Sequence, residues 1–247
     1  MNPEELLNRL CDAYEAALAD NFVGLYVHGS YAMGCFNPKK SDLDYILVCR
    51  DEPDDGVKRQ ILDATADGIV FAPAKGLEMH LMTLADCRSY RHPPYFATHY
   101  SPAHTASYAA DPEGYVARMK GRDLDLAAHL TVMNSCGLCW KGPGIAEIFG
   151  SVPREAYLES ILEDAGWSEG DCMYHVLNRC RILAYLTDGQ VLSKEEGALW
   201  ALDHLEEELL PPVREALACY EGDREMTATA QAEAFCAETL RRIRDMR

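Results

Sequence analysis

The sequence predicts a mixed α/β domain over residues 1–150, with a β-sheet and flanking helices, followed by an all-α helical-bundle domain over residues 151–247. Two observations predict this division. Up to residue 150, short apolar segments typical of strands are interleaved with amphipathic segments typical of helices. From Arg154 onward, only helical periods occur. A chain of 247 residues has the length of one or two domains of ordinary size.

The elements of both domains follow from caps and apolar spacing. Asn2 and Pro3 begin the first helix, because Asn is a favoured N-cap and Pro is favoured in the first turn. We expect strands over 22–29, 43–49, 76–84 and 138–142, and helices over 57–69 and 123–137. No long element is expected over 86–121. Helices of the second domain are expected over 154–165, 170–187, 193–208, 211–220 and 227–246.

The charge of the chain argues against a polyanionic partner. Asp and Glu number 40 against 23 Lys and Arg, which gives a net charge of −17. Binding of DNA or RNA phosphates needs clustered cations. The one dense cluster, "RRIRDMR", is typical of a cationic last helical turn. We therefore expect a cationic partner and no nucleic acid.

Compartment and assembly follow from weaker signals. The N-terminal segment is acidic and amphipathic rather than signal-peptide-like, and no apolar run reaches the roughly 20 residues that span a bilayer. The 10 Cys residues are scattered without paired metal spacing, which is typical of thiols in a reducing cytosol. We expect a cytoplasmic protein without a membrane partner. No pattern specifies an oligomeric state, and a monomer is the starting expectation.

Two acids in one predicted strand carry the main functional signal. Asp42 and Asp44 have the period-two spacing that places both side chains on the same face, with Leu43 and Tyr45 on the other. Solvent-facing acids on an edge strand would satisfy this pattern. Burial of two like charges without a partner is unfavourable. A divalent cation removes the conflict, and Mg²⁺ prefers carboxylate and phosphate oxygens.

Three further residues complete a candidate site. Gly29 and Ser30 end the preceding strand, where Gly permits close backbone approach and Ser offers a hydroxyl and an amide to a phosphate. Glu78, in the next strong strand pattern, is the candidate third carboxylate. It would activate a nucleophile or complete the metal site, and an outward-facing Glu is the alternative. The order strand, Gly-Ser, turn, Asp-x-Asp, strand therefore predicts a magnesium–phosphate site.

The motifs resemble those of a known superfamily. "HGSYAMGCFNPKKSDLDYILV" followed by "LEMHLM" resembles the nucleotidyltransferase superfamily related to DNA polymerase beta. "YHVLNRCRILAYLTDGQVLSKEEGALWAL" narrows the resemblance to the aminoglycoside nucleotidyltransferases that adenylylate streptomycin and spectinomycin at the 3″ and 9 hydroxyls. The resemblance covers nearly the whole chain. It implies a nucleotidyltransferase domain followed by a helical domain, with Mg²⁺ as cofactor, ATP as co-substrate, a cationic drug as acceptor, and antibiotic resistance as the outcome.

The resemblance also implies roles for residues of the first domain. Gly29 and Ser30 would hold the nucleotide triphosphate, and Asp42 and Asp44 would bind Mg²⁺. Glu78 matches the catalytic base, and it would also contribute to the metal site and to the binding of the drug's ammonium groups.

In the second domain, the resemblance implies that Arg181 and Lys194 reach the nucleotide phosphates and that Tyr220 lies near the nucleotide. Asp171 matches an acid that contacts the drug. A simple capping box at the start of a helix is the alternative for the segment that contains Lys194.

The acceptor is the least determined part of this prediction. Streptomycin-modifying members have a Trp after the third acid and an additional acid shortly before the Asp171 position. Here the corresponding segments contain "PPYFATHYSPAH", without Trp, and Trp167. These departures favour spectinomycin over streptomycin. A non-drug acceptor, such as a protein hydroxyl or another small molecule, and a non-catalytic nucleotide-binding module remain as alternatives.

Overall fold

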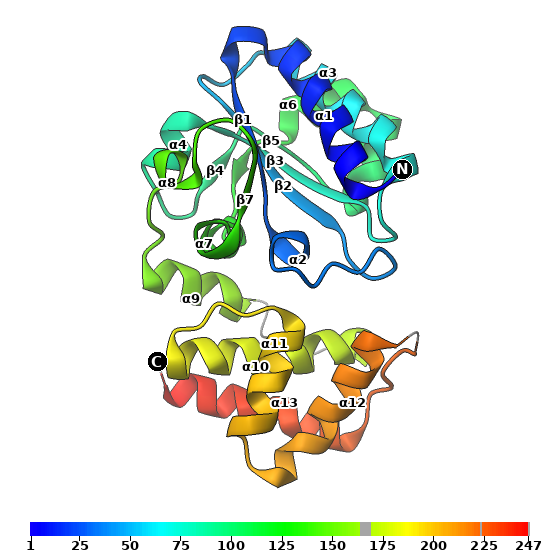
Figure 1. Cartoon of the computed structure of the whole chain (residues 1–247), viewed down its shortest axis with the longest axis vertical. Helices are drawn as coiled ribbons and strands as arrows, with labels where there is room; N and C mark the ends of the chain where they lie inside the picture. The colour runs from blue at the N-terminus through cyan, green and yellow to red at the C-terminus, as the bar shows by residue number, and fades with distance from the viewer. Residues whose placement is uncertain (164–168, 223, 247) are drawn as a thin grey trace. The chain divides into compact units, whose positions relative to one another are not determined.

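The computed structural model describes residues 1–163, 169–222 and 224–246. The chain divides into two compact units, Met1–Tyr157 and Leu158–Arg247, which are considered separately (Figure 1). The functional domain boundary after residue 150 remains a prediction. Within the described ranges, the helices are too short or too polar to cross a membrane.

A five-stranded mixed sheet forms the centre of the first unit, in the order β5-β3-β2-β1-β7. β2 and β3 run parallel, whereas the other neighbouring pairs are antiparallel. The strands are β1 (Phe22–Val27), β2 (Leu43–Cys49), β3 (Leu77–Thr83), β5 (Thr98–Tyr100) and β7 (Leu138–Lys141). A separate antiparallel pair consists of β4 (Tyr95–Phe96) and β6 (Gly121–Arg122). The predicted mixed sheet with flanking helices is thus confirmed.

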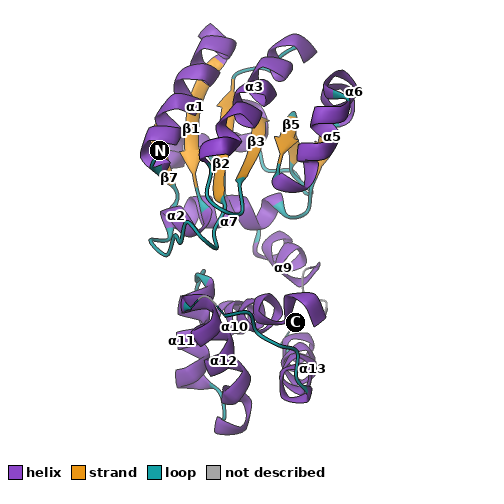
Figure 2. Ribbon diagram, turned by 90° about the vertical axis from the view of Figure 1, so that its right-hand side faces the viewer, coloured by secondary structure: helices purple, strands orange, loops and turns teal. Residues whose placement is uncertain are grey.

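Helices lie on both faces of this sheet (Figure 1). One face, onto which Figure 2 looks, packs against α1 (Pro3–Leu18), α3 (Asp55–Gly68) and α6 (Pro112–Arg118). The other face packs against α4 (Leu84–Arg88), α7 (Leu126–Cys136) and α8 (Ile145–Ile148). Two further short helices are α2 (Gly29–Ala32) and α5 (Thr105–Ala110). The strand side chains therefore divide between two apolar clusters, one on each face.

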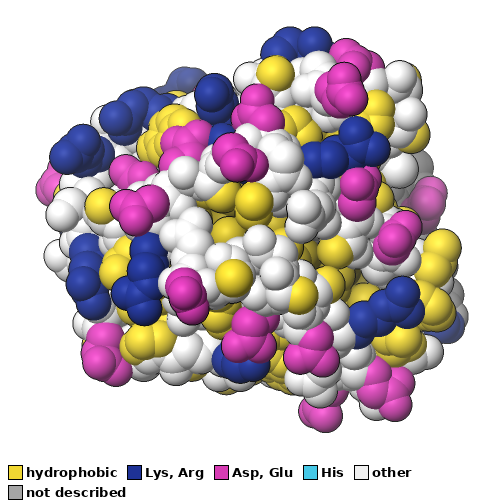
Figure 3. Space-filling model, turned by 90° about the horizontal axis from the view of Figure 1, so that it is seen from above, with side chains coloured by type: hydrophobic (Ala, Val, Ile, Leu, Met, Phe, Trp, Pro, Cys, Tyr) yellow, Lys and Arg dark blue, Asp and Glu magenta, His cyan; other side chains and the backbone are white. Residues whose placement is uncertain are grey.

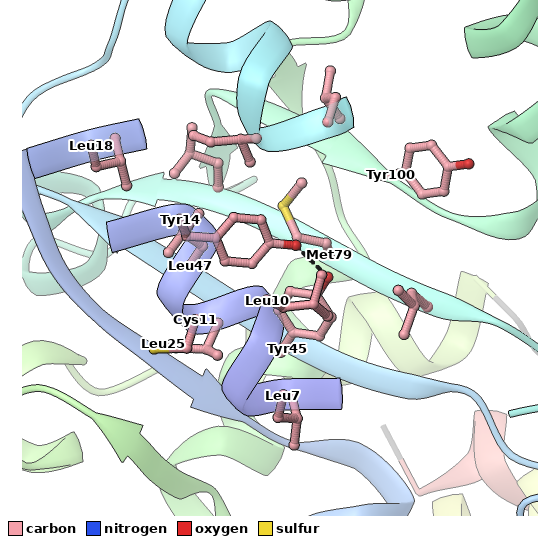
Figure 4. Close-up of a cluster of buried hydrophobic side chains, with 14 of the residues drawn as sticks. Leu7, Leu10, Cys11, Tyr14, Leu18, Leu25, Tyr45, Leu47, Met79 and Tyr100 are labelled. Carbon is pink, nitrogen blue, oxygen red and sulfur yellow. Dashed lines mark hydrogen bonds between the residues drawn. The ribbon is translucent and has the colours of Figure 1, made fainter. Parts of the chain in front are cut away.

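The start of α1 has the capping arrangement that its sequence predicts. The Oδ1 atom of Asn2 accepts a hydrogen bond from the backbone N of Glu5 at 2.8 Å, and Oε2 of Glu5 accepts one from the backbone N of Asn2 at 3.0 Å. These two bonds satisfy amide groups that have no partner within the helix. Leu7 and Leu10 then face the sheet in the buried cluster (Figure 4).

Tyr14 adds a polar contact inside this apolar cluster (Figure 4). Its hydroxyl lies 2.8 Å from the hydroxyl of Tyr45 on β2 and 2.7 Å from Oγ1 of Thr65 on α3. The Thr65 hydroxyl in turn donates to the carbonyl of Ile61 at 2.8 Å. Because buried hydroxyls need partners, this group of contacts fixes α1 and α3 against one strand.

One face of the protein carries side chains of both charge signs close together (Figure 3). On the face shown in Figure 3, acidic and basic side chains are interspersed among apolar ones. Arg59 and Asp63 form an ion pair along α3, with Nε 3.0 Å from Oδ2. At the C-terminus, Arg242 pairs with Glu206 and Glu238, both at 2.8 Å. This arginine is therefore engaged by carboxylates of the chain itself.

The second unit is mostly helical, as predicted. Its described helices are α9 (Arg154–Glu163), α10 (Cys172–Asp188), α11 (Lys194–His204), α12 (Leu210–Glu221) and α13 (Ala230–Asp245). The boundary between the two units falls within α9. Single turns of 3₁₀ helix in the two units are Ala19–Asn21, Ile69–Phe71, Pro102–His104, Glu169–Asp171 and Glu207–Leu209. The helix predicted over 154–165 extends beyond the described residues at its end, and Trp167 also lies outside them. α10 packs against α11, α12 and α13 around one apolar core.

Candidate active site

Three carboxylates come together at one end of the parallel strands. Asp44 on β2 is the register partner of Glu78 on β3, and Asp42 immediately precedes β2. One oxygen of each carboxylate lies within 4.8 Å of the others. Asp44 is 9% exposed, and the other two are half-buried. Side-chain alternation puts Asp44 and Glu78 on the sheet face covered by α7.

The Gly-Ser segment adjoins these acids because β1 and β2 are antiparallel. The carboxyl end of β1 lies beside the amino end of β2, and the backbone N of His28 donates to the carbonyl of Asp44 at 3.0 Å. α2 begins directly after β1, at Gly29 (Figure 1). Gly29 has φ +62°, and a Cβ at this position would lie 1.9 Å from Oδ2 of Asp44. Glycine is therefore required here by both conformation and contact.

Ser30 supplies a polar atom to the same region. Its Oγ is buried and has no hydrogen-bond partner among the described residues. A buried hydroxyl without a partner is unusual in a folded protein. Together with the three carboxylates, this group forms an oxygen-rich donor set of the kind that suits Mg²⁺ and phosphate. The residues present thus fit the cofactor that the sequence implies.

The charges around Glu78 oppose one another. Burial is the main cause that raises the pKa of the Glu78 carboxyl; the charge of His129 acts in the opposite direction, and Asp42 raises the pKa further. His129 lies on α7, and its Nε2 is 3.2 Å from Oδ2 of Asp125. Burial alone would lower the pKa of His129, but Asp125, Glu78 and Asp44 raise it to about 10. A cationic imidazole therefore balances part of the acidic charge.

Five histidine rings form a continuous row next to the acids. This row is not predicted from the sequence. The ring centroids of His28 and His129 are 4.8 Å apart, and those of His129 and His80 are 5.4 Å apart. His80 stacks on His99 at 4.0 Å, and His99 meets His104 at 5.1 Å. One signal was available, because His80 follows Glu78 by two residues and shares its strand face.

Arg181, predicted to contact the nucleotide, lies on α10 in the second unit. Its Nη2 donates to Oδ1 of Asn178 at 2.6 Å, whereas its Nε is buried without a hydrogen-bond partner among the described residues. α11 approaches it closely, since a Cβ on Gly197 would lie 2.6 Å from Cγ of Arg181. Asp171, predicted to contact the drug, precedes the first residue of α10.

Lys194 is the first residue of α11, and its Nζ lies 4.9 Å from the ring centroid of Tyr174, a cation–π geometry. The capping box considered as an alternative is present. Oγ of Ser193 accepts from the backbone N of Glu196 at 3.1 Å, and Oε2 of Glu196 accepts from the backbone N of Ser193 at 2.9 Å. Tyr220 lies on α12 and packs half-buried against the helical core. The functional roles of these residues remain predictions.

Comparisons with known proteins agree with this architecture. Residues 147–242 match the family model described as "Aminoglycoside adenylyltransferase, C-terminal domain". The chain is 22% identical over 237 residues to an "Aminoglycoside (3'') (9) adenylyltransferase" of Escherichia coli, covering 92% of this chain and 88% of that protein. A protein of the same name from Klebsiella pneumoniae is 23% identical over 241 residues, covering 93% and 90%.

One solved structure has the same fold over almost the entire length. It is the spectinomycin adenyltransferase AAD(9) from Enterococcus faecialis, crystallised with ATP and spectinomycin. The TM-score is 0.81 at 18% sequence identity, and the match covers 98% of this chain and 100% of that chain. The predicted fold class is therefore confirmed by an independent structure.

Proposed function

We propose that this chain, an aminoglycoside adenylyltransferase-like nucleotidyltransferase, transfers AMP from ATP to a hydroxyl of an aminocyclitol antibiotic. We infer that spectinomycin is preferred over streptomycin and that the reaction confers antibiotic resistance. The observation that carries the proposal is the convergence of Asp42, Asp44 and Glu78 within 4.8 Å, beside the Gly-Ser segment. Such a concentration of negative charge is stable only with cations nearby.

Asp42 and Asp44, with a contribution from Glu78, would hold Mg²⁺ and thereby the triphosphate of ATP. When bound, Mg²⁺ supplies charge neutralisation for the phosphates and the leaving pyrophosphate. Gly29 lets the backbone approach the Asp44 carboxylate. The Oγ of Ser30, which has no hydrogen-bond partner in the described part of the chain, is available to a phosphate oxygen. These two residues would position the nucleotide with respect to the acids.

Glu78 is the residue that would act as general base. It would accept the proton from the acceptor hydroxyl, whose oxygen then attacks the α-phosphorus of ATP while pyrophosphate leaves. Burial raises the pKa of this carboxyl, and a base with a raised pKa binds the proton more firmly. Its oxygen is close enough to those of the two Asp residues to serve the metal as well.

The second unit would supply further contacts. We propose Arg181 and Lys194 as phosphate contacts, Tyr220 as a nucleotide contact and Asp171 as a contact to the drug. The Nε of Arg181 supports this role. It is buried without a hydrogen-bond partner among the described residues, and such a guanidinium nitrogen favours an anionic partner. The net charge of −17 would assist the approach of a cationic acceptor.

Pyrophosphate release tests this function directly. The protein is incubated with ATP and Mg²⁺ and with spectinomycin, streptomycin or kanamycin, and release is compared with a sample without drug. We expect release that depends on spectinomycin. Release independent of every drug would indicate another acceptor, and the absence of release under all conditions would contradict the proposal. Asp42→Asn and Asp44→Asn serve as controls that should abolish the Mg²⁺-dependent reaction.

A further inference from the structure

A second set of potential metal ligands lies beside the acidic site. His80 on β3 and His99 on β5 are directly opposite each other in the antiparallel pair, and Glu78 is two residues before His80. Each of the three residues offers one ligand atom, and these atoms lie within 4.8 Å of one another. The two imidazole rings are stacked, with centroids 4.0 Å apart and an interplanar angle of 25°, so one ring must turn about its Cβ–Cγ bond before both can direct a nitrogen at the same ion. The sheet register thus presents one carboxylate and two imidazoles to the same space.

The hydrogen bonding of His99 leaves one nitrogen available as a ligand. Its Nδ1 lies 3.1 Å from the carbonyl oxygen of Met79, and a carbonyl can only accept, so this nitrogen carries the proton. The lone pair of the neutral ring is then on Nε2. Metal-binding histidines commonly have this arrangement, in which a backbone carbonyl fixes the ring and its tautomer.

His80 has no such partner among the residues that the structure describes. The side chain is only 2% exposed. Both ring nitrogens are therefore buried, yet neither forms a hydrogen bond to any described residue. Burial of a polar group without a partner is unfavourable, and such groups are rare in folded proteins. Phe96 packs edge-on to the ring at 5.8 Å and offers no compensating acceptor. A ligand bound between His80 and its neighbours would satisfy one of these nitrogens.

We propose that Glu78, His80 and His99 form a binding site for a divalent transition-metal ion of the Zn²⁺ type. Imidazole nitrogen is a preferred ligand of Zn²⁺, Co²⁺ and Ni²⁺, whereas Mg²⁺ prefers oxygen. The nitrogen-rich set is therefore chemically distinct from the set formed by Asp42, Asp44 and Glu78. Three protein ligands leave a coordination position open on a four-coordinate ion.

Glu78 belongs to both sets, which has a functional consequence. A metal ion held by the two histidines would engage the carboxylate that is proposed to act as the base. Zn²⁺ should therefore inhibit adenylyl transfer while Mg²⁺ is in excess. This consequence rests on the proposed function, whereas binding of the metal itself does not.

Titration with Co²⁺ tests the site by its visible absorption. The full chain, free of any affinity tag and kept in excess Mg²⁺, is compared with His80→Phe and His99→Phe. We expect one Co²⁺ ion bound by the wild-type protein. In each variant the Kd for Co²⁺ should rise by roughly 100-fold or more, because loss of even a group that only supports a ligand weakens metal binding by about 10–100-fold. His104→Phe is the matched control, since His104 belongs to the same row of rings but not to the ligand group, and it should leave the Kd unchanged.

The same titration distinguishes this site from metal binding elsewhere on the chain. All 10 cysteines are free thiols, and Co²⁺ bound to sulfur would add strong near-ultraviolet absorption that the histidine variants do not alter. That result, equal affinity in all variants, or no binding by the folded wild type would overturn the proposal. His80→Gln replaces the Phe variant if the latter does not unfold cooperatively. If no drug is adenylylated, the Co²⁺ titration still tests whether the histidine site binds a metal. If a drug is adenylylated but Co²⁺ does not bind, the proposed histidine site is wrong and the proposed function stands.

Discussion

Replacement of Gly29 by alanine tests whether the position of the Asp44 carboxylate controls the reaction. Gly29 has φ +62°, and an added Cβ would lie 1.9 Å from Oδ2 of Asp44 and 2.8 Å from its Cγ. Asp44 is nearly buried and its carbonyl accepts a hydrogen bond from His28, so its backbone is fixed by the sheet. We therefore expect the side chain, rather than the strand, to move.

The size of the effect follows from these distances. An ordinary contact begins near 3.4 Å, so the Asp44 carboxylate must retreat by 3.4 − 1.9 = 1.5 Å. A misplacement of about 1 Å in a catalytic site reduces turnover by about 100-fold. The positive φ adds roughly 1–2 kcal/mol of conformational strain for any residue other than glycine. Gly29→Ala should thus lower the free energy of unfolding by roughly 1–2 kcal/mol. It should lower the rate of transfer by about 100-fold.

Gly34→Ala is a matched control for the strain. Gly34 has φ +75°, but no other residue that the structure describes has an atom within 4 Å of a Cβ added there, apart from its chain neighbours. Both variants should lose similar unfolding free energy in urea titrations. Only Gly29→Ala should lose spectinomycin-dependent pyrophosphate release and require more Mg²⁺ for half-maximal rate. Equal loss of activity in both variants, or unchanged Mg²⁺ dependence in Gly29→Ala, would refute the reasoning.

Three further substitutions test separate parts of the structure. Glu78→Gln should reduce transfer by about 100- to 10,000-fold with ATP binding nearly intact; calorimetry that shows equal loss of ATP affinity would instead make Glu78 chiefly structural. Tyr14→Phe leaves the buried Tyr45 hydroxyl without one partner, so the free energy of unfolding in urea should fall by about 1–3 kcal/mol, and no change would contradict that role. Glu52→Gln removes the carboxylate that pairs with Lys58, whose side chain is 1% exposed. Because the Glu52 side chain is 35% exposed, we expect the free energy of unfolding to fall by about 2 kcal/mol, which is less than for a fully buried pair. Burial alone would raise the pKa of Glu52, but Lys58 lowers it below 4.5, so this stabilisation is present above pH 4.5 and is lost as the pH falls through the lowered pKa. Urea titrations at about pH 7 and about pH 3 should therefore differ less for the variant than for the wild type.

Much of the first unit could be predicted because its sequence signals are local. The strand predicted over 43–49 matches β2, since a short apolar run interrupted by one acid is typical of a buried strand. The N-cap at Asn2 was also predicted, because one side chain determines it. Asp42, Asp44 and Glu78 come together in the structure. The sequence signals for this group are the period-two spacing of the two Asp residues and the acid in the next predicted strand.

The row of histidines could not be predicted in the same way. It depends on β5, a strand of three residues, within the range 86–121 where the sequence predicts no long element. So short a strand has no measurable period, and its register with β3 is set by tertiary packing. Only that register places His99 opposite His80. Contacts of this kind are long-range, and a single sequence does not record them.

The chemistry of this region arises from a change of character along one sheet face. On β2, the residues that face α7 pass from Asp44 through Ile46 to Val48, whereas the opposite face is apolar throughout the strand. β3 repeats the gradient, with Glu78 and His80 at the beginning and Met82 near the end. A register slip of one residue would turn the acids toward the apolar core of α1 and α3, so burial of that core fixes the position of the acids. The same packing that stabilises the sheet therefore holds the carboxylates and imidazoles together, although their mutual repulsion and burial oppose it.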